Sequence, residues 1–206
     1  MFSRFLARAL VALALIPAIP ANAEDSVGSV SLVRDSAEER FGDESWDELF
    51  LDQAVFSDQF VRTPEDAAMH VLFVDGSVFR MGANSDAQID RYLFDPERGQ
   101  GEVALTLTSG VFRFISGSMN QLQDSEITVE TPTTTLGIRG TDVTVEVQDD
   151  ADILFVREGI VAVAPHGCPA TGAETLVTAG QTARVDGPSC AVARGTAPPR
   201  ADSGLD

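Results

Sequence analysis

Apolar residues recur after residue 26 in short runs rich in Val, Ile, Phe and Thr. These residue types favour β-strands, and the runs follow one another too closely to leave room for helices. Residues 142–148 alternate strictly, with three valines on one side and Thr144, Glu146 and Gln148 on the other. We therefore predict a half-buried strand there whose polar face lies in water. The other expected strands are residues 27–33, 67–74, 102–108, 126–131, 152–157, 160–164 and 181–185.

A residue followed by glycine separates two β runs at several places. Such pairs are typical of tight hairpin turns, because glycine accepts a positive φ without a Cβ clash. We predict hairpin turns at Asp75-Gly76, Ser109-Gly110 and Glu158-Gly159, and a further turn at Ala179-Gly180. Closely spaced strands joined by tight turns predict an all-β fold, with short antiparallel strands in a β-sandwich or β-roll.

The beginning of the chain has the pattern of an export signal. Arg4 and Arg8 precede an apolar run, and Ala21-Asn22-Ala23 fits the small-x-small cleavage pattern. The run is roughly half of the ~20 residues that span a bilayer, although an uncleaved anchor is the alternative. No later run is long enough to cross a membrane. We therefore expect a mature chain from Glu24, without a transmembrane segment, in the periplasm or outside the cell.

The remaining boundaries follow changes in composition. Residues 1–23 form the expected signal peptide, and residues 24–57 an N-terminal β segment with an acidic loop at 36–47. Residues 58–186 form the main β domain. Residues 187–206 offer little to bury and are expected to be a disordered tail.

Charge and cysteine content narrow the class of partner. The chain carries 32 acidic and 14 basic residues, and its net charge is −18. Such a surface repels phosphate backbones, so we expect no nucleic-acid partner. The two cysteines, Cys168 and Cys190, can form one disulfide in an oxidising compartment, and two free thiols are the alternative. Their separation gives no metal signature, and no cofactor is expected.

Four segments carry a family resemblance. They are residues 71–82 (VLFVDGSVFRMG), 105–117 (LTLTSGVFRFISG), 129–132 (VETP) and 136–142 (LGIRGTD). In this order and spacing they resemble the FecR domain of bacterial envelope proteins, over roughly residues 58–186. The resemblance implies a sensing or binding role. Family members that control a sigma factor combine a cytoplasmic segment, one membrane helix and a periplasmic sensor. We expect this chain to be a stand-alone exported branch without that relay.

The segment Gly137 to Asp142 is the candidate site. Gly137 and Gly140 allow a sharp bend or a close approach to a neighbouring strand, and Arg139 and Asp142 are near enough in sequence to pair across it. One interpretation is a structural corner made by Gly137, Arg139, Gly140, Thr141 and Asp142. The other is a ligand-facing loop in which Arg139 binds a carboxylate or phosphate.

Signatures of catalysis are sparse. His70 lies within an apolar strand, and His166 lies in a turn two residues before Cys168, whose oxidation would remove a thiol nucleophile. The cluster Asp149, Asp150 and Asp152 could bind Ca²⁺, but it lacks the pattern of a calcium loop. We predict no catalytic residues and no metal site. Trp46 and Tyr92 are the best candidates for exposed aromatic residues.

The sequence therefore predicts a non-catalytic binding or regulatory module that recognises a protein or an envelope component. A structural or scaffold domain of an envelope complex is the alternative, and an unrecognised hydrolase is a distant third. The residues do not identify the partner.

Overall fold

The computed structural model describes residues 26–168, 174–196 and 205, so the expected signal peptide lies outside the described residues. The described chain is almost entirely β, with one short 3-10 helix, η1 (Ser118–Gln121). The strands are β1 (Gly28–Arg34), β2 (Glu38–Phe41), β3 (Asp47–Glu48), β4 (Ala54–Val55), β5 (Gln59–Thr63), β6 (Ala68–Phe73), β7 (Val78–Met81), β8 (Ser85–Asp95), β9 (Gln100–Ile115), β10 (Asp124–Glu130), β11 (Thr134–Val147), β12 (Ala151–Pro165), β13 (Thr175–Thr178), β14 (Thr182–Asp186) and β15 (Ala191–Gly195).

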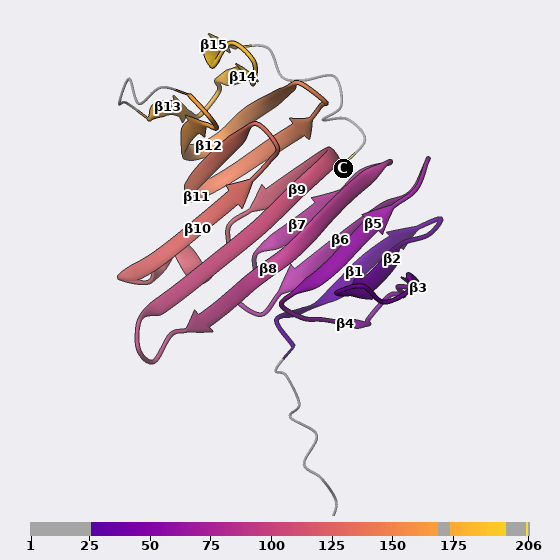
Figure 1. Ribbon diagram of the computed structural model, residues 1–206. Helices are drawn as coiled ribbons and strands as arrows, with labels where there is room; N and C mark the ends of the chain where they lie inside the picture. Colours follow the sequence, from indigo (N-terminus) through magenta and orange to yellow (C-terminus); the bar gives the residue numbers. More distant parts are fainter. Residues whose placement is uncertain (1–25, 169–173, 197–204, 206) are drawn as a thin grey trace, which may run out of the picture.

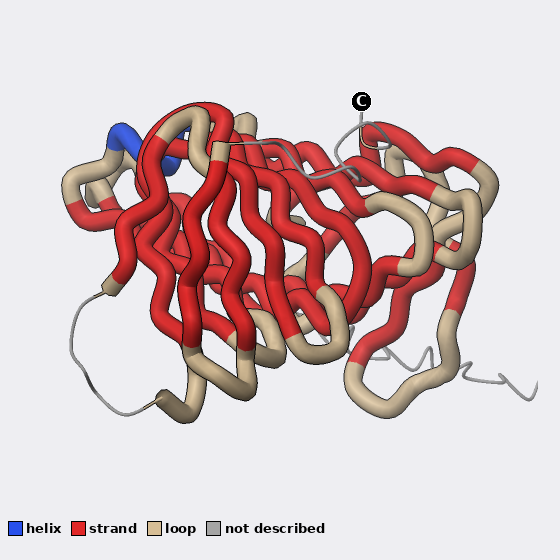
Figure 2. Tube along the Cα trace, turned by 90° about the horizontal axis from the view of Figure 1, so that it is seen from above, coloured by secondary structure: helices blue, strands red, loops and turns tan. Residues whose placement is uncertain are grey.

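The strand pairings define two layers. Layer A runs in the order β3, β2, β5, β8, β9, β10, β11, β12 and β13. Layer B runs in the order β4, β1, β6, β7, β9, β11, β12, β14 and β15. The strands succeed one another along the molecule from β1–β5 to β12–β15 (Figure 1). Viewed from above, they form stacked rows joined by loops at their ends (Figure 2). The predicted all-β fold is confirmed.

Three long strands belong to both layers. The first half of β9 pairs with β8 and β10, and its second half pairs with β7 and β11. Strands β11 and β12 change layers in the same way, since their two ends have different neighbours. The prediction of short antiparallel strands is therefore only partly right: β9 spans 16 residues, and β9 and β10 are parallel.

The hairpin turns predicted at Ser109-Gly110 and Glu158-Gly159 are wrong. Both pairs lie inside strands, β9 and β12, at the points where those strands pass from one layer to the other. Gly110 and Gly159 do have positive φ, 109° and 81°. A bend inside a strand requires the same backbone freedom as a hairpin turn, so the sequence pattern does not separate the two. The Asp75-Gly76 pair does lie in a turn, between β6 and β7.

The N-terminal segment is part of the same fold. Strand β1 pairs with β6, and β2 pairs with β5, so residues 26–57 contribute to both layers. The loop expected at 36–47 is wrong over Glu38–Phe41, because these residues pair with β5 as an outer strand of layer A. One apolar core fills the space between the layers and includes side chains from β1 through β14.

The tail expected from residue 187 is ordered over part of its length. Strand β15 pairs with all of β14, and Cys190, next to it, forms a disulfide with Cys168. The Cα atoms of the two cysteines are 5.9 Å apart. The disulfide and the backbone pairing hold this segment, and Val192 is its one side chain packed against the core.

Strand β11 confirms half of the expected alternation. Val143, Val145 and Val147 are buried in the core as predicted. The opposite face was expected to be wet, yet Thr144 on that face is completely buried. The outer face of layer B is therefore covered at this point, which a strand pattern alone does not reveal.

Candidate functional site

The Asp75-Gly-Ser77 turn is a buried hydrogen-bonding centre. The Asp75 carboxylate accepts hydrogen bonds from the backbone N–H and hydroxyl of Ser77, both at 2.8 Å, and from the backbone N–H of Met119 at 2.9 Å. Ser77 in turn accepts a hydrogen bond from the backbone N–H of Gly117 at 2.8 Å. The turn thereby anchors the chain around η1 to layer B. These are structural contacts, because each buried polar group is satisfied within the chain.

Tyr92 belongs to the same centre. Its hydroxyl donates a hydrogen bond to Asp75, and its ring stacks on Phe73 with the ring centroids 4.3 Å apart. Burial, the hydrogen bond to Asp75 and the negative charge of that carboxylate raise the pKa of Tyr92 above its ordinary value. The prediction that Tyr92 is an exposed aromatic residue is wrong, since only 7% of its surface is exposed.

The Gly137–Asp142 segment forms the corner at which β11 changes layers. Gly140 has a φ of 56°, and the neighbouring Gly159 of β12 lies so close that a Cβ there would be 2.2 Å from the Gly140 carbonyl oxygen. Thr141 is buried, and its backbone exchanges hydrogen bonds with Ser116. Gly137 pairs with Thr128 and Ala162 within layer A. The arrangement favours the structural interpretation of this segment.

The expected pairing of Arg139 with Asp142 is wrong. The Asp142 carboxylate instead accepts two hydrogen bonds from the Arg113 guanidinium of β9, from Nε and Nη2, both at 2.8 Å. The two side chains are 12% and 17% exposed, so this bidentate pair is largely enclosed. Arg139 is exposed, so the two residues of the expected pair lie in different surroundings.

Asp152 is the second buried carboxylate. It lies in β12 with no exposed surface and accepts hydrogen bonds from the hydroxyls of Thr131 and Thr133, on either side of Pro132. Asp149 and Asp150 of the proposed calcium cluster are exposed, in contrast to Asp152. Among the described residues, no group of three His, Cys, Asp or Glu side chains is placed to hold a metal ion.

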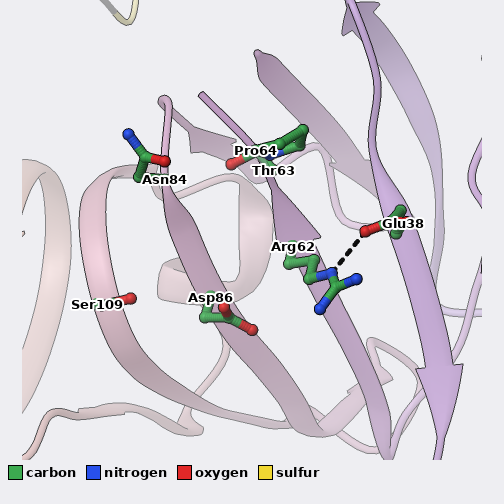
Figure 3. A pocket seen from close by; sticks show the side chains of 7 residues that line it. All are labelled: Glu38, Arg62, Thr63, Pro64, Asn84, Asp86 and Ser109. Carbon is green, nitrogen blue, oxygen red and sulfur yellow. Dashed lines mark hydrogen bonds and ion pairs between the residues drawn. The ribbon is translucent and has the colours of Figure 1, made fainter. Parts of the chain in front are cut away.

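A shallow pocket of about 390 Å³ lies where β5 ends and β8 begins (Figure 3). It is lined by Glu38, Arg62, Thr63, Pro64, Asn84, Asp86 and Ser109. The Arg62 guanidinium forms an ion pair with Glu38 at 2.5 Å and lies 4.1 Å from the ring centre of Trp46. Two carboxylates surround one cation, so the pocket disfavours anionic ligands. Sequence reasoning missed it because its residues come from separate strands.

The outer face of layer B carries exposed apolar side chains at one end. Leu32 of β1 and Leu72 of β6 project from neighbouring strands, and Val74 follows β6. Phe50 and Leu51 lie in the turn that runs beside β1, where the Asp52 backbone N–H donates to the Val30 carbonyl. We call these five residues the apolar patch. Their exposed fractions range from 36% to 58%, which is high for large apolar side chains.

Basic side chains lie next to the apolar patch on the same face. The strand register aligns His70 of β6, Arg80 of β7 and Arg113 of β9 in one row. Burial, and then the positive charges of Arg80 and Arg34, lower the pKa of His70 below its ordinary value. The positive charges of Arg80 and Arg34 therefore act on His70, whereas the charge of Arg113 is already paired with Asp142. We call His70, Arg80 and Arg113 the basic row.

The ordered motifs and the buried Asp75 turn can now be compared with known proteins. The FecR protein family model matches residues 59–162, just over half of the chain. The chain belongs to the FecR family. This confirms the resemblance carried by the four sequence segments. A comparison with curated proteins finds no match.

Solved structures support the same fold. Two crystal structures of a "putative anti-sigma factor" from Parabacteroides distasonis ATCC 8503, at 1.65 and 2.50 Å resolution, match with a TM-score of 0.51 and 15% sequence identity. Each match covers 66% of this chain and 59% of the other. This FecR-family chain therefore spans less than two thirds of the length of those relatives. Within the described residues, no helix has the length and apolar character needed to span a membrane.

Proposed function

We propose that this FecR-family chain is an exported, non-catalytic regulatory module that binds a protein component of the cell envelope. The apolar patch is the observation that carries the proposal. Large apolar side chains gathered on one face of a chain with so many charges are typical of protein-binding surfaces. The relatives described as an anti-sigma factor support a regulatory role, in which the working contact is between proteins.

The patch lies where an added strand could also pair. Strand β4 is at the edge of layer B and pairs only with Gly28 and Ser29 of β1. The next turn binds Val30, and beyond it no described strand pairs with β1 on that side. A partner that contacts the patch would reach this edge as well, combining apolar contact with backbone hydrogen bonds. Apolar contact would thus supply affinity for a protein partner, and backbone pairing would fix its orientation.

The test is capture of a partner by the full mature chain. Tagged wild-type protein and the Leu72→Asp variant would be cross-linked to envelope extract, and the captured proteins identified by mass spectrometry. We expect capture of one protein by the wild type to fall by about tenfold or more with Leu72→Asp, because an unpaired charge in the centre of an interface is poorly tolerated. Leu176→Asp is the matched control, since Leu176 of β13 is exposed to 52%, against 44% for Leu72, and β13 lies at the opposite end of the molecule (Figure 1). Equal capture by all three proteins would refute the placement.

Export is proposed on two features, the signal pattern of residues 1–23 and the disulfide between Cys168 and Cys190. The pairing of cysteines fits an oxidising compartment. Fractionation of cells that produce the full chain should release the processed protein with the periplasm or the medium. Recovery of the unprocessed chain in the cytoplasm, with both thiols free to alkylation, would overturn this part.

A further inference from the structure

Leu205 is buried against strands that are far from it in the sequence. Only 1% of its surface is exposed, and it is among the largest completely buried side chains. Its carbonyl oxygen accepts a hydrogen bond of 2.8 Å from Nη1 of Arg80, in the basic row. A residue 125 positions away is thus held against β7 by a charge-assisted hydrogen bond.

The seat for the Leu205 side chain exists because β7 is followed by glycine. A Cβ on Gly82 would lie 3.3 Å from Cδ2 of Leu205 and 3.6 Å from Cβ of Val111. Gly82 does not have a positive φ, so backbone conformation does not require glycine here. The absence of a side chain leaves the space that Leu205 fills. Thr144 of β11 pairs with Arg113 on the same face. Thr144 is completely buried.

Charge complements this seat. Arg80 lies beside it and Arg34 is close enough to His70 to affect its titration, whereas Arg113 is already paired with Asp142. In the sequence, Leu205 lies between Asp202 and Asp206. A peptide that presents a leucine among carboxylates therefore matches both the apolar seat and the cations around it.

We propose that the groove formed by Arg80, Gly82 and Val111 is a docking site for an acidic, leucine-containing segment of the partner protein. Leu205 occupies this groove in cis, and the partner segment competes with it. The inference rests on the proposed function, since the groove and the apolar patch share the outer face of layer B. It adds the chemistry of the partner: one large apolar side chain flanked by carboxylates.

Competition in cis has a measurable consequence. A ligand attached to its own site has an effective concentration in the millimolar range, so a free peptide binds the wild-type chain weakly. Removing the Leu205 side chain frees the groove. The affinity for a peptide in trans should then rise, even though the groove residues are unchanged.

The experiment is a titration of full mature protein with a fluorescein-labelled peptide that has the sequence of residues 200–206, followed by fluorescence anisotropy. We expect the Leu205→Asp variant to bind about tenfold more tightly than the wild type. Adding Gly82→Val to that variant should abolish binding, because the valine methyl groups fill the seat. Gly195→Val is the matched control, since Gly195 lies in β15 with nothing within 4 Å of its Cβ position.

A second measurement tests the docking site even if the Leu205→Asp variant folds poorly. The NMR signals of the Leu205 methyl groups should show contacts to Val111 in the wild type and lose them in Gly82→Val alone. Equal peptide binding by Leu205→Asp and by the Leu205→Asp/Gly82→Val double variant would refute the docking site. Absence of peptide binding by both variants would also refute it. If the peptide of residues 200–206 does not bind while Leu72→Asp still captures less of the partner, the proposed function stands and the docking site is wrong. If the peptide binds as expected but Leu72→Asp captures normally, the apolar patch fails instead.

Discussion

Arg113 and Asp142 form a largely enclosed ion pair, with both side chains less than a fifth exposed. The two residues are separated by 29 positions and belong to β9 and β11. Their bidentate geometry joins these strands on the outer face of layer B. Removing one partner takes a counter-charge away from an enclosed side chain, which is the costly case for an ion pair.

We expect Asp142→Ala to lower the free energy of unfolding by about 3 kcal/mol for this reason. Arg139→Ala, three residues earlier and exposed, should cost less than about 0.5 kcal/mol. Urea denaturation followed by circular dichroism measures both. A larger loss for Arg139→Ala than for Asp142→Ala would show that the sequence-based pairing of Arg139 with Asp142 was right after all.

His70 gives the protein a pH dependence with a defined sign. Burial, together with Arg80 and Arg34, holds its pKa below the usual value of 6.5. In the unfolded chain, histidine takes up a proton near pH 6.5. The unfolded state therefore binds more protons in this range, and the free energy of unfolding falls as the pH drops from about 6.5 toward the lower pKa of folded His70.

We expect His70→Gln to remove that part of the slope when unfolding is measured by urea titration between about pH 5 and pH 8, where histidine changes its charge. His166→Gln is the control, because His166 is the second of the two histidines in the chain. An unchanged slope in His70→Gln would contradict the assigned burial.

At the scale of strands, glycine has two different tasks in this fold. Gly180 lies in a turn with a φ of 79° and open space around its Cβ position. Gly159 has nearly the same φ, 81°, but lies against the backbone of Gly140 and Arg139. One position requires only a conformation, and the other also requires a close approach of two strands.

The two glycines allow these costs to be separated. Gly180→Ala should lower the free energy of unfolding by about 1–2 kcal/mol, the cost of a positive φ. Gly159→Ala should cost more than about 3 kcal/mol, because its Cβ would be 2.2 Å from the Gly140 carbonyl oxygen. Thermal denaturation of both variants measures the difference. Equal losses would mean that the corner relaxes to admit a side chain.

The same glycines show what a sequence can and cannot predict here. Strand positions follow from composition and alternation, so β1, β6, β10 and β14 were expected near their observed places. A glycine pair signals positive φ but does not say whether the chain returns as a hairpin or continues into another layer. The Arg113–Asp142 pair, the pocket and the groove all join distant strands, and they depend on register that local patterns do not encode.

One missed signal was present in the sequence. Residues 67–74 are apolar on both faces of the expected strand, whereas a strand with one wet face should alternate. The structure explains the excess, because Leu72 and Val74 belong to the apolar patch on the outer face. The missing alternation therefore predicts exposed apolar side chains on the outer face, which is the feature on which the proposed function rests.

At the scale of the molecule, the disulfide holds the last described strands in place. Cys168 follows β12, and Cys190 precedes β15, so the bridge closes a segment that contains β13 and β14. The sequence separation of 22 residues corresponds to a stabilisation of about 3 kcal/mol in the chain-entropy model. β15 itself contributes little apolar burial, since most of its residues are exposed.

Dithiothreitol should therefore lower the melting temperature of the wild-type protein to that of a Cys168→Ser/Cys190→Ser variant. The variant itself should not respond to the reductant, which serves as the control. Scanning calorimetry measures both transitions. A wild-type protein that melts at the same temperature with and without reductant would show that β13–β15 are held by strand pairing alone.

The three strands that change layers have a mechanical consequence. In a sandwich made of separate sheets, a load on one sheet reaches the other only through side-chain contacts, which slide under shear. Here β9, β11 and β12 carry it through covalent backbone, because each belongs to both layers. A force applied to the outer face of layer B is therefore transmitted to layer A along three continuous strands. The two layers should resist shear as one unit.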